Sequence, residues 1–283
     1  MIILKLGGSV LTKKDLENSE INYTNLNRIA IEIKDALNNK SNNNKLSEGL
    51  IIIHGAGSFG HPLAKKYRIG EPFTKEQHSE KRIGFSKTQN SVKKLNTLIC
   101  EAFINHEIPC VCLQASSFIT TNNKRINNFN LDLIKRYLKE GFIPVIYGDV
   151  VLDDKLKIAV LSGDQILQYI SKNLKINNSK SKKEVILGTD VDGVFTKNPK
   201  KYDDAIHISK LSSLDEIKEF DSTTNIDVTG GMIGKIKELL ELADMGIESR
   251  IINANEPKTI FNALENKNVK GTLIKKNIDH ISN

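Results

Sequence analysis

The sequence predicts an α/β protein with a mostly parallel central sheet that helices cover on both faces. Short apolar runs alternate along the chain with longer segments in which apolar residues recur every three or four positions. Such alternation favours parallel strands joined by helical crossovers. The chain has 283 residues, of which 39% are hydrophobic and 27% charged, and this is ordinary for a globular protein of one large or two small domains.

The strands and helices are expected in alternating order. Strands are predicted at Ile2–Leu6, Leu50–Ile53, Pro109–Leu113, Phe142–Tyr147, Glu184–Leu187 and Arg250–Ile252, because each is a short apolar run. Helices are predicted at Leu26–Leu37, Phe85–Asn105, Leu131–Lys139, Asp164–Leu174, Met232–Met245 and Pro257–Leu264. In residues 232–245 the apolar positions follow a period of 3.6 especially clearly. Residues 147–159 are expected to form a short β-ribbon around the Leu152–Leu156 turn.

Two polar stretches interrupt this pattern. Residues 38–45 and 177–183 are rich in asparagine, serine and lysine, which is typical of exposed loops. The first is expected to be a surface connection before a strand. The second is a candidate boundary between two lobes of one domain, which would comprise residues 1–178 and 179–283.

The composition limits the classes of function. The formal net charge is +7, which favours anionic partners, but aromatic residues are only 6% and tryptophan is absent. No basic stripe interleaved with aromatic residues is found, so nucleic acid is not an expected partner. Cys100, Cys110 and Cys112 form no CxxC pair, so neither a zinc site nor a disulfide framework is indicated, and a cytoplasmic protein is expected. No signal peptide and no apolar run of membrane-spanning length is found.

The first motif that carries chemistry joins a lysine-bearing strand to a glycine turn. Lys5 lies in the first apolar run, Gly7-Gly8-Ser9 follow, and Lys13 and Lys14 come next. Glycines allow backbone N–H groups to approach an anion, and lysines neutralise its charge, so phosphate binding is indicated. The spacing is not that of a P-loop. A buried strand with a solvated lysine pair is the simpler alternative.

The second motif is Gly55-Ala56-Gly57-Ser58-Phe59-Gly60-His61, directly after an apolar strand. A strand, a glycine turn and a possible helix through residues 64–67 together suggest an anion site. The match to the Rossmann fingerprint is formal only, because no acidic residue ends a following strand. His61 could donate to a phosphate oxygen or cap the turn, whereas His54 closes the strand and is expected to be structural.

Two further motifs place aspartates beside turns. Gly148-Asp149 is followed by Gly163-Asp164, where Asp164 could cap a helix or hold site lysines in place. Asp149 could be a turn residue or line an acceptor site. Thr189-Asp190 begins a turn at a strand end, where contact with a nucleotide is expected, because the spacing lacks the rest of a calcium loop.

The last motif opens the amphipathic helix near the C-terminus. Gly230 and Gly231 precede Lys235, which lies in the first turn of the expected helix. A cation there is unfavourable with respect to the helix dipole, and a bound polyphosphate would relieve this. A solvated lysine on the polar face is the alternative.

Taken together, KLGGS, SGDQ, TDVDGV and DVTGGMxxK resemble the amino acid kinase superfamily, and HGAGSFGHPLAKKY resembles more specifically its isopentenyl phosphate kinase branch. The resemblance spans about residues 1–254. It implies an open αβα sandwich whose N-terminal lobe binds a phosphate acceptor and whose C-terminal lobe binds ATP. The implied reaction transfers the ATP γ-phosphoryl group to isopentenyl phosphate, in an alternative mevalonate route to isoprenoids. A cytoplasmic homodimer is also implied.

The resemblance implies a role for each motif. The catalytic set would be Lys5, Lys14, His61, Asp164 and Lys235, with Lys13 as the neighbour of Lys14 that could share its role. The ATP-binding set would be Lys5, Gly7, Gly8, Ser9, Ala56, Thr189, Asp190, Gly230, Gly231 and Lys235. The acceptor-binding set would be Gly55, Gly57, Gly60, His61, Gly148, Asp149 and Gly163. Magnesium would be held mainly by ATP and water rather than by protein ligands.

Three rival functions remain open on the sequence. A related kinase could act on another phosphate or phosphonate, as fosfomycin-type kinases and UMP kinases do. A non-catalytic nucleotide-binding regulator is possible, although all the candidate lysines are present. A nucleic-acid-binding protein would explain the +7 charge. The residues around the acceptor's hydrocarbon chain follow no motif, and candidates are the Ile83–Leu95 segment and Phe118 or Ile146.

Overall fold

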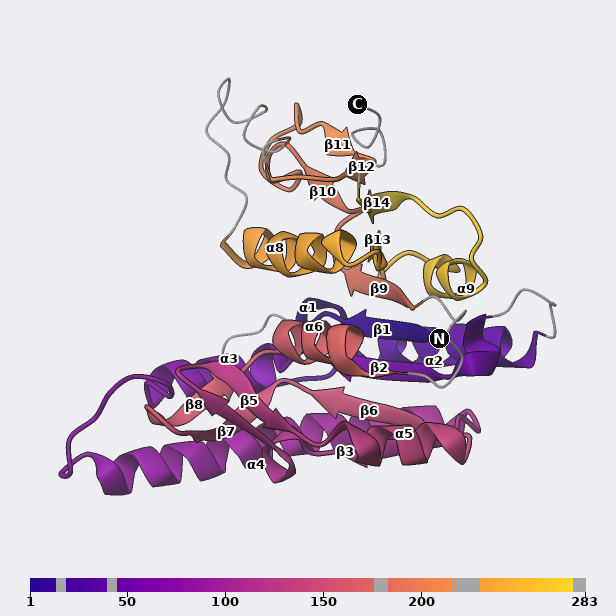
Figure 1. The fold of residues 1–283 in the computed structure, drawn as a ribbon. Coiled ribbons are helices and arrows are strands. Elements are labelled where there is room, and N and C mark those ends of the chain that lie inside the picture. The colour runs from indigo at the N-terminus through magenta and orange to yellow at the C-terminus, as the bar shows by residue number, and fades with distance from the viewer. Residues whose placement is uncertain (14–18, 40–44, 176–182, 215, 217–229, 277–283) are drawn as a thin grey trace.

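A computed structural model describes residues 1–13, 19–39, 45–175, 183–214, 216 and 230–276 (Figure 1). Its main sheet has eight strands in the order β12-β14-β13-β9-β1-β2-β6-β3. Every neighbouring pair is parallel except β13 and β14. The predicted α/β class, with a mostly parallel sheet, is confirmed.

The strands of the main sheet are β1 (Ile2–Leu6), β2 (Leu50–His54), β3 (Cys110–Leu113), β6 (Ile143–Tyr147), β9 (Glu184–Thr189), β12 (Lys210–Leu211), β13 (Glu248–Asn253) and β14 (Gly271–Ile274). A four-stranded sheet contains β4 (Ile119–Asn122), β5 (Arg125–Phe129), β7 (Asp149–Asp153) and β8 (Lys157–Leu161), and a ribbon pairs β10 (Val194–Phe195) with β11 (His207–Ile208). The β7–β8 hairpin is the ribbon expected over residues 147–159.

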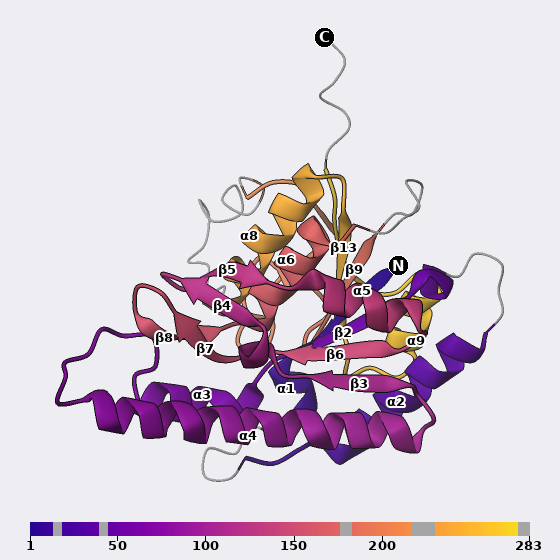
Figure 2. The ribbon, with the colours of Figure 1, turned by 60° about the horizontal axis from the view of Figure 1, so that its bottom comes forward.

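The helices are α1 (Gly8–Leu11), α2 (Tyr23–Asn38), α3 (Gly57–Lys66), α4 (His78–Asn105), α5 (Leu131–Lys139), α6 (Gly163–Asn173), α8 (Gly230–Asp244) and α9 (Thr259–Leu264), with 3₁₀ turns η1 (Lys45–Glu48) and η2 (Ala115–Ser117). Figure 2 shows α2, α3 and α4 on one side of the sheet and α5, α6 and α8 on the other. This arrangement is the αβα sandwich that the sequence predicted.

The alternation of side chains along β1 divides the core into two layers. Ile2, Leu4 and Leu6 pack toward α2 and α4, whereas Met1 and Ile3 pack toward α6 and α8. Because side chains alternate across a strand, Lys5 points to the same face as Ile3. The lysine is therefore presented toward α6, where Asp164 lies.

Helix α3 begins seven residues before the segment that the sequence suggested. Pro62 lies inside it and lacks the N–H that would bond to the carbonyl of Ser58. The hydroxyl of Ser19 donates to that carbonyl instead, at 2.9 Å. The partner comes from a distant segment, so sequence periodicity could not reveal how the helix tolerates its proline.

Candidate active site

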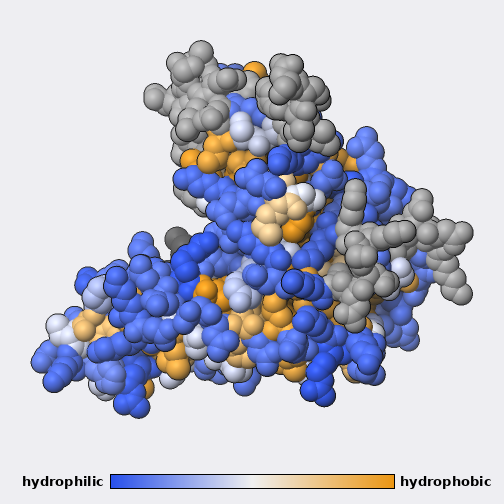
Figure 3. All heavy atoms as spheres, in the orientation of Figure 1, coloured by the Kyte–Doolittle hydropathy of each residue, from blue (hydrophilic) through white to orange (hydrophobic). Residues whose placement is uncertain are grey.

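A cavity of about 540 Å³ lies where the carboxyl ends of the central parallel strands meet. In the view of Figure 3 the surface is hollowed between α8 and the part of the molecule that carries α3 and β8. The predicted site residues that line the cavity are Lys5, Gly7, Gly8, Ser9, Gly55, Ala56, Gly57, Gly60, His61, Gly148, Asp149, Gly163, Asp164, Thr189, Asp190 and Lys235. Motifs spread over more than 230 residues are thus gathered around one cavity.

The two N-terminal glycine turns lie directly against each other at the bottom of this cavity. A Cβ atom on Gly8 would lie 2.6 Å from both the Cα and the N of Gly57, and Gly57 itself has a φ of +50°. The turns are further held by Gly7 N donating to Gly188 O at 2.8 Å and Gly55 N to Leu6 O at 3.1 Å. Glycine is therefore required at this contact for steric and conformational reasons.

Lys5 carries a buried ammonium group that pairs with the carboxylate of Asp164. Its side chain is 5% exposed, and its Nζ lies 2.7 Å from Asp164 Oδ1. Burial lowers the pKa of Lys5, Asp164 opposes that change, and the positive charge of Lys235 adds to it. Asp164 does not cap α6, since the hydroxyl of Ser162 accepts from Gln165 N at 3.2 Å. Its carboxylate is thereby available to Lys5.

Two more basic side chains face the same cavity. Lys235 comes from α8 and His61 from α3. Burial lowers the pKa of His61, and the charges of Lys235 and Lys5 lower it further. His61 is therefore neutral near pH 7, and the ammonium groups of Lys5 and Lys235 are the lining groups that an anionic ligand would contact.

Asp149 is buried beside the β7 end of the cavity. Its Oδ2 accepts from Ser116 N at 3.2 Å and its Oδ1 from Val150 N at 2.8 Å. Burial raises the pKa of Asp149, and these hydrogen bonds oppose the rise. The carboxylate accepts from two backbone amides, which fixes the Gly148-Asp149 turn beside the cavity.

The Thr189-Asp190 turn closes the opposite side of the cavity. Asp190 Oδ1 accepts from Ser9 Oγ at 3.0 Å, and its Oδ2 lies 2.6 Å from Lys200 Nζ. Thr189 is mostly a structural residue, because its hydroxyl donates toward the carbonyls of Val191 and Ile252 at 2.9 and 3.2 Å. Lys200 was not predicted from the sequence.

His54 supports the second glycine turn from below and is structural, as predicted. Its Nδ1 lies 2.9 Å from Gly55 O and its Nε2 3.1 Å from Asn96 Nδ2, so Nδ1 donates and Nε2 accepts. Its ring stacks on Tyr147 with centroids 5.3 Å apart. Burial lowers the pKa of His54 to about 4, which keeps the ring neutral.

An apolar wall forms part of the cavity lining. It comprises Ala64, Val92, Val150 and Val160 from α3, α4, β7 and β8, with Thr88 one turn before Val92. Met232 lines the cavity from α8. Thr88 and Val92 belong to the predicted Ile83–Leu95 segment. Phe118 packs instead against Phe129, with ring centroids 5.5 Å apart, and Ile146 is fully buried in the core.

Some predicted residues do not reach the cavity or lie outside the described part of the chain. Lys14 and residues 227–229 fall outside the described residues. Lys13 is exposed and pairs with Glu20 at 2.6 Å. Gly230 and Gly231 form the start of α8. Among the residues that the structure describes, no group of three or more His, Cys, Asp or Glu side chains is arranged to hold a metal ion.

The fold and the cavity define a class: an α/β protein with paired glycine turns, a buried lysine and a half-buried lysine at the ends of parallel strands, an arrangement typical of phosphate sites. The family model of the Amino acid kinase family matches residues 1–253. The chain belongs to this family, and within it to the isopentenyl phosphate kinase branch.

Two curated relatives and two solved structures support this assignment. Isopentenyl phosphate kinase of Methanothermobacter thermautotrophicus is 50% identical over 277 residues, covering 97% of this chain and 98% of that protein. The Methanocaldococcus jannaschii protein of the same name is 38% identical, with the same two coverages. A solved isopentenyl phosphate kinase structure has a TM-score of 0.83 at 47% identity, covering 97% of this chain and 99% of that chain. UMP kinase of Ureaplasma parvum, at 16% identity and a TM-score of 0.61, shares the fold.

Proposed function

We infer that this protein transfers the γ-phosphoryl group of ATP to isopentenyl phosphate, giving isopentenyl diphosphate and ADP. The observation that carries the inference is one cavity that joins glycine turns and the lysines Lys5 and Lys235 to an apolar wall. That combination suits an acceptor with a phosphate at one end and a hydrocarbon chain at the other. The identity to two curated isopentenyl phosphate kinases over nearly the whole chain supports the same acceptor.

The chemical difficulty of this reaction is to bring two anions together. The acceptor phosphate already carries a negatively charged oxygen at neutral pH, so a strong general base is not required. In-line attack on the γ-phosphorus forms the new P–O bond as the bond to ADP breaks, and charge builds up on the transferring group. Positioning and positive charge therefore account for most of the catalysis.

The site residues are proposed to divide this work. Lys5 and Lys235 hold the donor phosphates, with Lys14 at the transferring group. Gly7, Gly8 and Ser9 donate hydrogen bonds to the same phosphates, and Asp164 keeps Lys5 in place. On the acceptor side His61 grips the phosphate beside the Gly55–Gly60 turn.

The cavity also suits a magnesium ion that ATP brings with it. Each carboxylate lining it is already engaged: Asp164 with Lys5, Asp149 with two backbone amides, and Asp190 with Ser9 and Lys200. ATP oxygens and water would therefore hold the ion, with Asp190 able to accept from that water. Bound there, magnesium supplies charge neutralisation on the donor phosphates.

We also propose that the protein is a homodimer that works in isoprenoid synthesis by an alternative mevalonate route. Strand β3 ends the main sheet, and the neighbouring α4 exposes Ile83 and Ile104, which are 54% and 56% accessible. Light scattering on the purified protein tests the dimer.

None of the helices in the described part of the chain combines the length and the apolar character needed to span a membrane. We propose a cytoplasmic location for the protein.

The reaction is tested with purified protein, ATP, magnesium and isopentenyl phosphate. We expect a product heavier than the acceptor by one phosphoryl group and one ADP formed for each product molecule. ATP binding with no such product would leave a nucleotide-binding regulator as the better explanation.

A further inference from the structure

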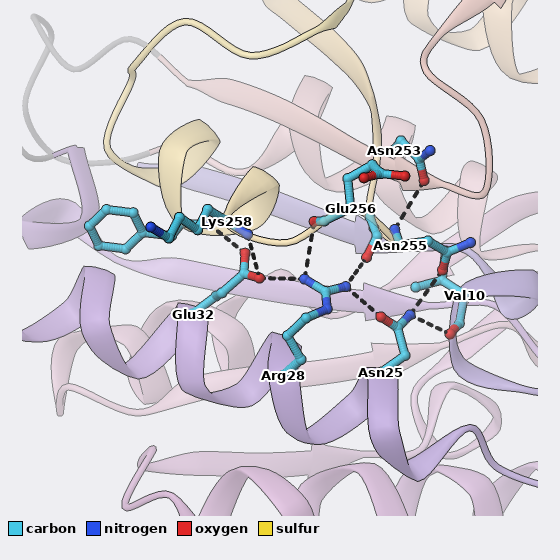
Figure 4. A network of polar contacts seen from close by, with 10 residues as sticks. Val10, Asn25, Arg28, Glu32, Asn253, Asn255, Glu256 and Lys258 are labelled. Carbon is cyan, nitrogen blue, oxygen red and sulfur yellow. Dashed lines mark hydrogen bonds and ion pairs between the residues drawn. The ribbon is translucent and has the colours of Figure 1, made fainter.

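A closed ring of hydrogen bonds links helix α1 to the turn after β9 by two routes. The short route is the contact of Ser9 Oγ with Asp190 at 3.0 Å. On the long route Asn25 Nδ2 donates to both Val10 O at 2.9 Å and Asn255 Oδ1 at 3.0 Å (Figure 4). The route continues from Asn255 N to Asn253 Oδ1 at 3.0 Å and from Asn253 Nδ2 to Asp192 Oδ1 at 2.8 Å.

Asn25 is the buried member that closes this ring. It is 8% exposed, it lies in the first turn of α2, and its two Nδ2 hydrogens serve α1 and the segment after β13. Its Oδ1 accepts from Arg28, which also donates to the carbonyls of Ala254 and Glu256. A buried amide with every polar atom paired can hold one geometry firmly.

Helix α1 needs such support because it is short. It spans Gly8–Leu11, a single turn, and isolated helices of this length are unstable. It nevertheless carries Gly8 and Ser9, which line the cavity. Its orientation is therefore set by its neighbours: Asp190 holds the hydroxyl of Ser9, and Asn25 holds the carbonyl of Val10.

We propose that Asn25 is a positioning residue for phosphoryl transfer, which holds the Gly8-Ser9 turn in register with the Thr189–Asp192 turn. The proposal rests on the kinase function inferred above. Asn25 does not line the cavity and acts through α1 and through Asn255. A misplacement of about 1 Å can cost about 10² in rate, so a residue behind the site can control the chemical step.

The test compares Asn25→Leu with a matched control on the same helix. Asn39, at the other end of α2, donates from its amide to Glu265 just after α9, so it also ties α2 to the C-terminal part. It lies 14 residues from Asn25, roughly 20 Å along a helix. We expect Asn25→Leu to lower kcat by about 10–100-fold with the KM for either substrate changed less than about threefold. Asn39→Leu should keep kcat within about twofold of the wild type.

Two more variants separate positioning from loss of stability. Asn255→Ala opens the ring at an exposed residue and should fold normally while lowering kcat by a smaller factor, about threefold or more. Asp153→Asn weakens the contacts of this buried carboxylate with the backbone N–H groups of Lys124 and Leu156, so it should lower Tm without lowering kcat by more than about twofold. The proposal is wrong if Asn25→Leu and Asn255→Ala keep wild-type kcat, or if the two controls lose as much.

A readout that does not depend on turnover completes the test. In ¹⁵N-labelled protein, Asn25→Leu should shift the amide resonances of Ser9 and Asp190, and Asn39→Leu should leave them in place. Unchanged resonances in Asn25→Leu would overturn the proposal whatever the reaction is. A wild-type protein that gives no isopentenyl diphosphate would instead contradict the proposed function, and the resonances would still decide the role of Asn25.

Discussion

At the scale of single residues, the cavity is built around charges that are unfavourable without a ligand. Burial and the charge of Lys235 lower the pKa of Lys5, and Asp164 opposes them. Burial and the charges of Lys235 and Lys5 lower the pKa of His61. An anionic ligand would raise the pKa of both groups, so the residues proposed to bind phosphate are coupled to one another through their charges.

Asp164→Asn tests this coupling. Loss of the carboxylate should lower the pKa of Lys5 further, because its opposing charge is gone. The protonated lysine is the form that neutralises phosphate, so activity should fall about tenfold or more, and its alkaline decline should move to lower pH. The measurement is kcat/KM against pH. Asp132→Asn removes a surface carboxylate that contacts Lys135 and is the control. If kcat/KM of Asp164→Asn declined at the same alkaline pH as that of the wild type, the coupling would be contradicted.

His61 should take up a proton when the acceptor binds. Its pKa lies below the usual 6.5 in the free protein, and a phosphate dianion nearby should raise it. Acceptor affinity should therefore increase as the pH falls toward 6, as long as the acceptor phosphate stays ionised. NMR titration of the ring with and without isopentenyl phosphate measures the shift.

Substitutions of His61 check its role in binding. His61→Ala should raise the KM for the acceptor more than His61→Asn, which can still donate, and the exposed His78→Asn is the control. An acceptor KM in His61→Ala equal to that of the wild type would exclude the proposed grip on phosphate.

Sequence motifs predicted most cavity residues but not their supporting partners. Lys5, His61 and Asp164 could be found because each lies beside glycines at the end of an apolar run. No such sequence signal marks Lys200 or Asn25. Lys200 is one of 41 basic residues and carries no local signal, and Asn25 acquires its function from Val10 and Asn255, a contact that spans 230 positions.

At the scale of elements, the two glycine turns act as one unit. Gly8→Ala would place a Cβ 2.6 Å from the backbone of Gly57, so one turn must move. We expect a loss of about 1–3 kcal/mol in unfolding free energy and a fall of about 10² in kcat. The control is Gly234→Ala in α8, next to Lys235, where a Cβ would meet nothing within 4 Å and should stabilise the helix by up to about 1 kcal/mol. Chemical denaturation and initial rates on both variants decide this. A kcat of Gly8→Ala equal to that of the wild type would show that catalysis does not require the close contact between the two turns.

The buried contact between His54 on β2 and Asn96 on α4 predicts that the free energy of unfolding depends on pH. His54 has a pKa of about 4 when folded and 6.5 when unfolded, so the unfolded state binds more protons between these values. Folding should therefore lose about 3 kcal/mol as the pH falls from 6.5 to 4. His54→Phe keeps the ring but cannot titrate, so its denaturation midpoint should depend less on pH. Equal pH dependence in both proteins would contradict the burial of a neutral His54.

Elements with strong periodicity were predicted closely, and elements held by distant partners were not. The expected strand at residues 2–6 and helices at residues 131–139 and 164–174 match β1, α5 and α6 to within one residue. Helix α4 begins at His78 rather than Phe85, because its first turns pack on α3 and carry few apolar residues. The β4–β5 hairpin and β14 were missed, because their strands read ITTN, RINNF and GTLI and none of them is a continuous apolar run.

At the scale of the whole molecule, one continuous sheet carries both sides of the site. Strand β1 lies between β9 and β2, so the turns after β1 and β9, which are proposed to hold ATP, lie at the same edge as the turn after β2, which is proposed to hold the acceptor. Helix α8 and the β7–β8 hairpin flank this edge: α8 adds Lys235, and the hairpin completes the apolar wall together with α3 and α4. The proposed lobes, residues 1–178 and 179–283, would then meet at the β1–β9 contact, where phosphate transfer is proposed to occur.

The central claim is that one cavity binds both a phosphate and the hydrocarbon chain attached to it. It is tested most directly by comparing kcat/KM for isopentenyl phosphate with that for methyl phosphate, UMP and fosfomycin under identical conditions. Each buried CH₂ contributes about 0.8 kcal/mol, so the four carbons that isopentenyl phosphate has beyond methyl phosphate should raise kcat/KM by at least tenfold and by up to about 200-fold. A preference for isopentenyl phosphate of that size over all three is the result we predict. Equal use of methyl phosphate, or faster turnover of UMP or fosfomycin, would contradict it.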